Sequence, residues 1–146
     1  MRPETELILA IAQEIAYNQR NGCLAVIRED NLDWVRLKDG LIYHRLVPFA
    51  YVILKEHLSL LPDDLANFLK VNYYYSLGHT CYLQQRFLSV YKAFQGEDIT
   101  LVPIKGMAFL EHLYAEYPPV RSSVDIDVLI KEGDLEQATE ILEGLG

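Results

Sequence analysis

The stretch that decides the fold is Arg121-Ser122-Ser123-Val124-Asp125-Ile126-Asp127-Val128-Leu129-Ile130, an apolar segment that carries two aspartates two positions apart. Alternate residues of a β-strand point to the same face, so we expect Asp125 and Asp127 side by side, with Cβ atoms roughly 6–7 Å apart. The opposite face then directs three apolar residues into a core: Ile126, Val128 and Ile130.

Adjacent carboxylates repel each other unless a cation lies between them. Mg²⁺ prefers oxygen ligands and keeps coordination positions for substrate phosphates, so the pattern indicates a magnesium site on Asp125 and Asp127. Two simpler interpretations stand beside it: acidic residues on the wet face of a strand, or Asp125 serving a turn.

The residues around this stretch predict alternating strands and helices. We expect a strand over 99–104, a helix over 107–114, a strand over 124–130, and a last helix capped by Asp134. Pro103 lacks an N–H group, which places the first strand at a sheet edge or at its own end. The segment 97–146 is therefore expected to be a small β-α-β-α core.

The residues before Gly96 predict helices. Apolar residues follow helical spacing over 7–16, and a second helical stretch is expected to begin near Asn31 as its cap and to break at Gly40. The state of residues 23–27 stays undecided.

Two prolines mark the helices that follow. Residues 41–58 continue as an apolar helix that Pro48 must kink or restart. Pro62 opens a helical pattern that runs to Gly96, and its length leaves a break near Gly78 open. The predicted fold class is thus α+β: a mostly helical portion, 1–96, packed on the core formed by 97–146 as one compact unit.

Composition limits the classes of function. The formal net charge is −8 and there is no basic run, which argues against broad nucleic-acid binding. The two cysteines fit no metal spacing, and no signal peptide or membrane-length apolar run is present, so we expect a cytoplasmic protein.

The turn at Lys105-Gly106 combines three features that attract phosphate. It stands where a strand passes into a helix, whose N-terminus offers unpaired N–H groups. Glycine lets the backbone approach a ligand, and lysine adds a point charge. On a strand beside Asp125 and Asp127, this turn is expected to lie near the metal.

These residues together resemble an uncharacterised nucleotidyltransferase family of the polymerase-beta-type superfamily. The resemblance covers roughly residues 30–146 and rests on five ordered elements: His44-Arg45-Leu46-Val47-Pro48, Lys105-Gly106, Tyr117-Pro118 with Arg121, Asp125-Ile126-Asp127, and Asp134-Leu135-Glu136-Gln137-Ala138.

The resemblance implies metal-dependent transfer of a nucleotidyl group from ATP or another nucleoside triphosphate to an unknown acceptor. It implies that Asp125 and Asp127 are catalytic and hold Mg²⁺, with two metals about 3.5–4 Å apart clamping the reacting oxygens. Lys105 and Gly106 would face the triphosphate. Arg121 and Ser123 would contact phosphate oxygens, against the alternatives of a surface or carboxylate-pairing role for Arg121 and turn chemistry for Ser123.

One departure from the superfamily pattern leaves a second function open. Its members carry a third carboxylate on a later strand, and this sequence ends at Gly146 without one. We therefore expect a longer natural chain, a further strand from residues 23–27, or a homo-oligomer formed through the sheet edge or the helical half. The alternative function is a degenerate nucleotidyltransferase-like binding or interaction domain whose helical half docks a partner, unless Glu97, Asp98, Glu111 or Glu116 reaches the site.

Overall fold

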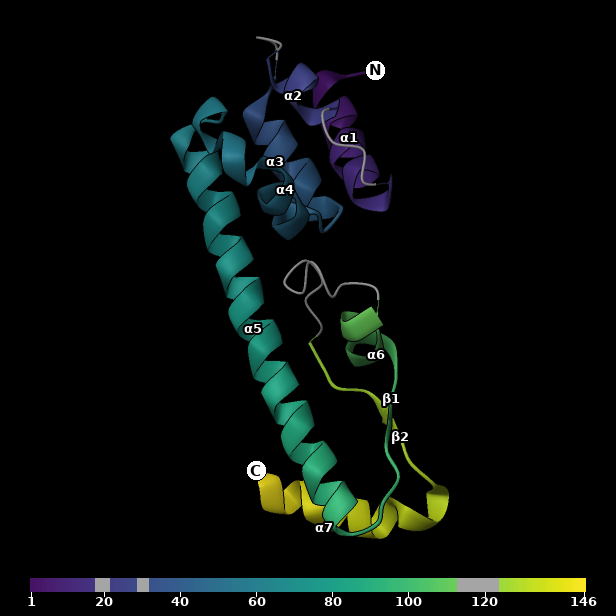
Figure 1. Ribbon diagram of the computed structural model, residues 1–146. Coiled ribbons are helices and arrows are strands. Elements are labelled where there is room, and N and C mark those ends of the chain that lie inside the picture. The colour runs from purple at the N-terminus through teal and green to yellow at the C-terminus, as the bar shows by residue number, and fades with distance from the viewer. Residues whose placement is uncertain (18–21, 29–31, 113–123) are drawn as a thin grey trace. The chain divides into compact units, whose positions relative to one another are not determined.

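The structure is a computed structural model that describes residues 1–17, 22–28, 32–112 and 124–146 (Figure 1). Its elements are, in order, α1 (Pro3–Tyr17), α2 (Gly22–Ile27), α3 (Trp34–Tyr43), α4 (Val47–Leu54), the 3₁₀ helix η1 (Lys55–Leu60), α5 (Asp63–Gly96), β1 (Val102–Pro103), α6 (Lys105–His112), β2 (Val128–Leu129), the 3₁₀ helix η3 (Glu132–Asp134) and α7 (Leu135–Leu145). The predicted mostly helical α+β fold is confirmed.

The chain forms two compact units, an N-terminal unit of residues 1–76 and a C-terminal unit of residues 77–146. The long helix α5 contributes to both of them. Gly96, where the sequence predicts the change from helices to strands, is the last residue of α5.

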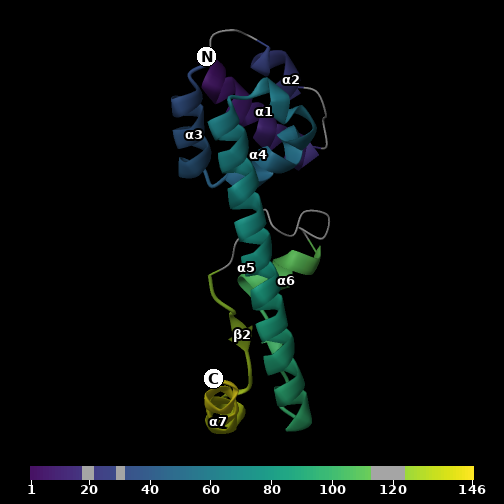
Figure 2. The same ribbon diagram turned by 90° about the vertical axis from the view of Figure 1, so that its left-hand side faces the viewer.

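The N-terminal unit packs α1 to α4, η1 and the start of α5 around one apolar core (Figure 2). Its fully enclosed side chains come from α1 to α5 and include Leu7, Ile11, Cys23, Leu37, Leu41, Leu54, Leu65 and Leu69. Residues 23–27, undecided from sequence, belong to the helix α2, which buries Cys23, Val26 and Ile27.

Helix α3 begins and continues differently from the prediction. Its cap is Asp33 rather than Asn31: the Asp33 side chain accepts a hydrogen bond from the backbone N–H of Arg36 at 3.0 Å. The predicted break at Gly40 is wrong. A Cβ at this position would lie 2.5 Å from Ile8 Cδ1, so glycine serves the close approach of α3 to α1.

The segment His44-Arg45-Leu46-Val47-Pro48 is a turn between two helices. Arg45 takes a left-handed conformation with φ 57°, and the N–H of Leu46 donates to the carbonyl of Leu41 at 2.8 Å, closing the end of α3. Pro48 then stands in the first turn of α4, where its missing N–H is harmless. The predicted restart at Pro48 is confirmed, and His44 is an exposed residue of the turn.

The C-terminal unit is built around Phe94, which is 1% exposed. Its core joins the end of α5 to the segment that leads into β1, to β2 and to α7, through Phe94, Ile99, Leu101, Ala138, Val128, Ile130 and Ile141. Helix α5 continues past Gly78 without a break. It is closed by Asp98, which has φ 56°, and by the N–H of Ile99 donating to the carbonyl of Phe94 at 2.9 Å.

The sheet consists of β1 and β2, paired antiparallel with Val102 opposite Leu129 and Pro103 opposite Val128. Both strands are shorter than the predicted 99–104 and 124–130. The element order β1-α6-β2-α7 is the predicted β-α-β-α order (Figure 1).

Candidate functional site

The antiparallel pairing of β1 and β2 brings the Lys105 turn beside the acidic stretch. Immediately after β1, the backbone N–H of Ile104 donates to the carbonyl oxygen of Asp127 at 3.0 Å. One residue further, the ammonium of Lys105 lies 3.1 Å from Asp127 Oδ2. A backbone bond and an ion pair therefore hold together two segments that are about twenty residues apart in sequence.

The turn itself is compact because Lys105 takes an uncommon backbone conformation. Its φ of 49° is left-handed, which costs a residue with a side chain about 1–2 kcal/mol and is tolerated where other contacts fix the chain. Here the chain passes from β1 into α6 within two residues. Gly106 and Met107 are buried directly behind the exposed lysine.

The stretch 124–130 is extended only in part. Val124 and Asp125 form a bend, and regular pairing is limited to Val128 and Leu129. The two aspartates therefore precede the strand. The predicted strand over 124–130 was too long because an apolar alternating pattern reports which side chains are buried, and pairing also requires a neighbouring strand of equal length.

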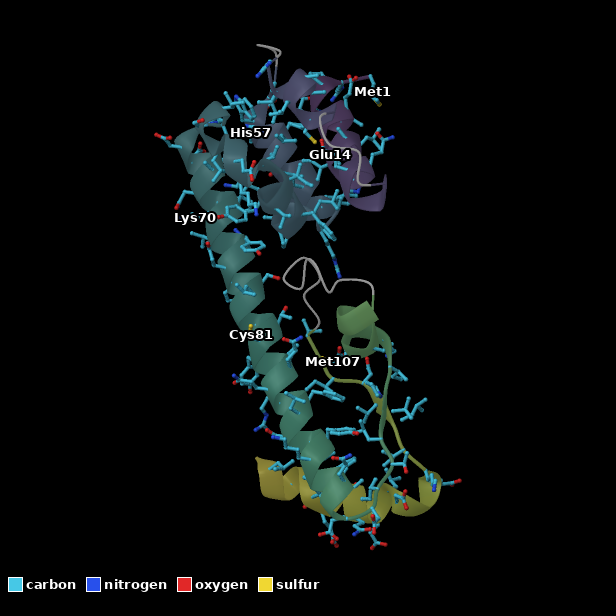
Figure 3. All side chains as sticks on the ribbon, in the orientation of Figure 1. Met1, Glu14, His57, Lys70, Cys81 and Met107 are labelled. Carbon is cyan, nitrogen blue, oxygen red and sulfur yellow. The ribbon has the colours of Figure 1, made fainter. Side chains whose placement is uncertain are left out.

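The apolar face predicted for this stretch is confirmed by its packing. Ile126 contacts the small cluster of Leu83 and Met107, the latter labelled in Figure 3. Val128 and Ile130 pack against the Phe94 core. These three anchors fix the backbone that carries Asp125 and Asp127.

The two aspartates differ in their surroundings. Asp125 is exposed. The Asp127 side chain is 29% exposed, against 68% for Lys105, so Asp127 is the more enclosed partner of the ion pair. An exposed carboxylate, a half-buried carboxylate and an ammonium in one small region provide ligands for a cation and a counter-ion for an anion.

The remaining predicted site residues are placed unequally. Gly106 lies in the first turn of α6, next to Lys105. Arg121 and Ser123 lie outside the described residues, as does Glu116 and the side chain of Glu111.

The described candidates for a third carboxylate have other roles. Glu97 accepts a hydrogen bond from the Gln137 amide at 3.1 Å, and Asp98 is the left-handed residue that closes α5. No group of three or more His, Cys, Asp or Glu side chains that could hold a metal occurs within residues 1–17, 22–28, 32–112 and 124–146.

The direct contact of Lys105 with Asp127 is the feature that the sequence interpretation missed. It assigned the lysine to phosphate and the aspartate to metal, without pairing them. The signal available in the sequence is Pro103, which ends β1. In an antiparallel pair, the residues that follow the end of one strand lie beside the residues that precede the other, so Lys105 lies beside Asp127.

Comparison with known proteins gives one match. A family model described as an uncharacterised nucleotidyltransferase matches residues 30–146, which is most of the chain. No curated protein and no solved structure matches the chain. Among the described residues, no helix has the length and apolar character needed to cross a membrane.

Proposed function

The chain belongs to this uncharacterised nucleotidyltransferase family, and on that premise we propose that it binds a magnesium–nucleoside triphosphate and transfers the nucleotidyl group to an acceptor. The observation that carries the proposal is the contact of Lys105 with Asp127 at 3.1 Å. It brings one residue of each predicted half of the site, the phosphate turn and the acidic stretch, into one place.

The residues present fit magnesium. Mg²⁺ is typically held by one or two carboxylates together with waters and substrate phosphates, rather than by a cage of protein ligands. Asp125 and Asp127 supply that donor set.

In this proposal Asp125 and Asp127 would hold the metal, which would supply neutralisation of charge at the phosphates. Lys105 provides a charged donor to the triphosphate, and Gly106 permits close approach of the backbone. Arg121 and Ser123 are proposed as further phosphate contacts. The oxygen of an acceptor hydroxyl forms a bond to the α-phosphorus and loses its proton to solvent, the bond from that phosphorus to the bridging oxygen breaks, and pyrophosphate leaves with those electrons.

Calorimetry tests the proposal through binding. We expect the wild-type chain to bind ATP in the presence of Mg²⁺, and Asp125→Asn and Asp127→Asn each to weaken this affinity by at least about tenfold, since each removes a ligand charge. Glu140→Gln, which neutralises an exposed acid on α7, is the matched control and should leave the affinity unchanged. Equal affinities for ATP in Mg²⁺ in the wild type and in both aspartate variants would show that Asp125 and Asp127 do not form the site.

The alternative is a domain that binds the nucleotide without transferring it. The observation in its favour is that no third carboxylate joins the pair among the described residues. Incubation with ATP labelled at the α-phosphate separates the two functions, because transfer releases unlabelled pyrophosphate and leaves the label on an acceptor. Binding in calorimetry with no label transferred to any acceptor would favour the binding domain.

A further inference from the structure

We infer that Lys105 and a divalent cation compete for the same carboxylate, Asp127, so that the site accepts the cation together with a triphosphate far better than the cation alone. Lys105 is then a positioning and selectivity residue, which exchanges its contact with Asp127 for a contact with phosphate. This inference rests on the proposed function and specifies how that site discriminates a free cation from a cation–nucleotide complex.

The competition follows from the position of the ammonium. Lys105 Nζ lies 3.1 Å from Asp127 Oδ2. A magnesium ion bound to that oxygen would stand about 2.0–2.1 Å from it, which brings a double positive charge close to the ammonium. Two cations at such a distance repel each other, so the contact of Lys105 with Asp127 opposes binding of the metal to that carboxylate.

The structure identifies the lysine as the partner that moves. Its side chain is 68% exposed and ends a flexible four-carbon stem, so it can swing into solvent without disturbing a core. Asp127 is fixed. Its carbonyl accepts the Ile104 hydrogen bond at 3.0 Å, and its neighbours Ile126 and Val128 are anchored by packing.

The selectivity comes from where the displaced ammonium goes. A free cation takes Asp127 and leaves Lys105 without a counter-ion. A cation–triphosphate complex takes Asp127 and brings phosphate oxygens to a lysine that stands at the start of α6, so a new charge-assisted contact replaces the old one. Metal and nucleotide binding are therefore coupled positively, and the coupling is reciprocal.

Removal of the ammonium is predicted to have opposite effects on two affinities. In Lys105→Gly, Mn²⁺ alone should bind about two- to fivefold more tightly, the range of an exposed ion pair, because its competitor is gone. The affinity for ATP in Mg²⁺ should fall by about tenfold. Glycine is chosen because it adopts a φ of 49° without strain, and Lys105→Asn is a second neutral variant suited to that conformation.

The measurements are titration of free Mn²⁺ by electron paramagnetic resonance and calorimetry with ATP and Mg²⁺. Lys92→Ala, which removes an exposed lysine of α5, controls for net charge and should change neither affinity. If both Lys105 variants bind Mn²⁺ no more tightly than wild type while ATP binding persists, the competition is wrong and the proposed function stands. If the wild type binds neither probe, both fall.

Discussion

Replacing Phe94 with alanine should unfold or loosen the C-terminal unit and take the candidate site with it. Phe94 is 1% exposed and belongs to the cluster of residues through which α5, β2 and α7 pack together. Phenylalanine-to-alanine changes at such positions lower the free energy of unfolding by about 3–5 kcal/mol, because the side chain's transfer free energy is lost and a cavity remains. A unit of this size is stabilised by only about 4–10 kcal/mol, so the change removes a large part of its stability.

Hydrogen exchange read residue by residue is the suitable assay, because it reports each unit separately. We expect Phe94→Ala to lower protection in α7 and in the C-terminal part of α5, and to leave the Leu7 and Leu41 region of the N-terminal unit unchanged. Tyr82→Ala, an aromatic residue of α5 that is 59% exposed, is the control and should cost less than about 1 kcal/mol. Equal protection in the two variants would refute the assignment of Phe94 as the centre of this core.

Two further predictions concern the packing of the N-terminal unit, one at Cys23 and one at Gly40. Burial, and then the hydrogen bond with Glu14, raise the pKa of the Cys23 thiol, so at pH 8 a smaller fraction of Cys23 is thiolate than of an ordinary cysteine. A disulfide reagent should therefore label the exposed Cys81 in the native chain and Cys23 only after unfolding. Gly40→Ala places its Cβ 2.5 Å from Ile8 Cδ1, so the strain of displacing the end of Ile8 should offset the gain in helix propensity and leave the free energy of unfolding nearly unchanged. In an Ile8→Val background, which lacks that atom, the same change should stabilise the chain by about 1 kcal/mol. Thermal melts compare the four chains, and an equal effect of Gly40→Ala in both backgrounds would contradict the contact.

The elements that the sequence predicts well are those set by local chemistry. Pro48 restarts a helix because its ring and missing N–H act on its own turn, and α5 ends at the predicted Gly96, although the break considered near Gly78 does not occur. The packing of the partly buried Ile126, Val128 and Ile130 against the core follows from their alternation in the sequence.

The features that escape prediction depend on contacts distant in sequence. Gly40 looks like a helix break until Ile8 of another helix is seen to lie against it. The strands 99–104 and 124–130 shorten to two residues each because their pairing partner, and not their own pattern, limits them. The pair Lys105–Asp127 likewise depends on the register of that pairing: Pro103 marks where β1 ends, but no local pattern encodes which residue lies opposite it.

The most direct test of the site is the location of a paramagnetic metal bound with its nucleotide. With ATP and substoichiometric Mn²⁺ added to ¹⁵N-labelled protein, the amide signals of residues 104–106 and 125–128 should broaden first, because nuclei nearest the ion relax fastest. Uniform broadening, or broadening confined to another acidic region such as Asp63 and Asp64 at the start of α5, would place the metal elsewhere and contradict the account.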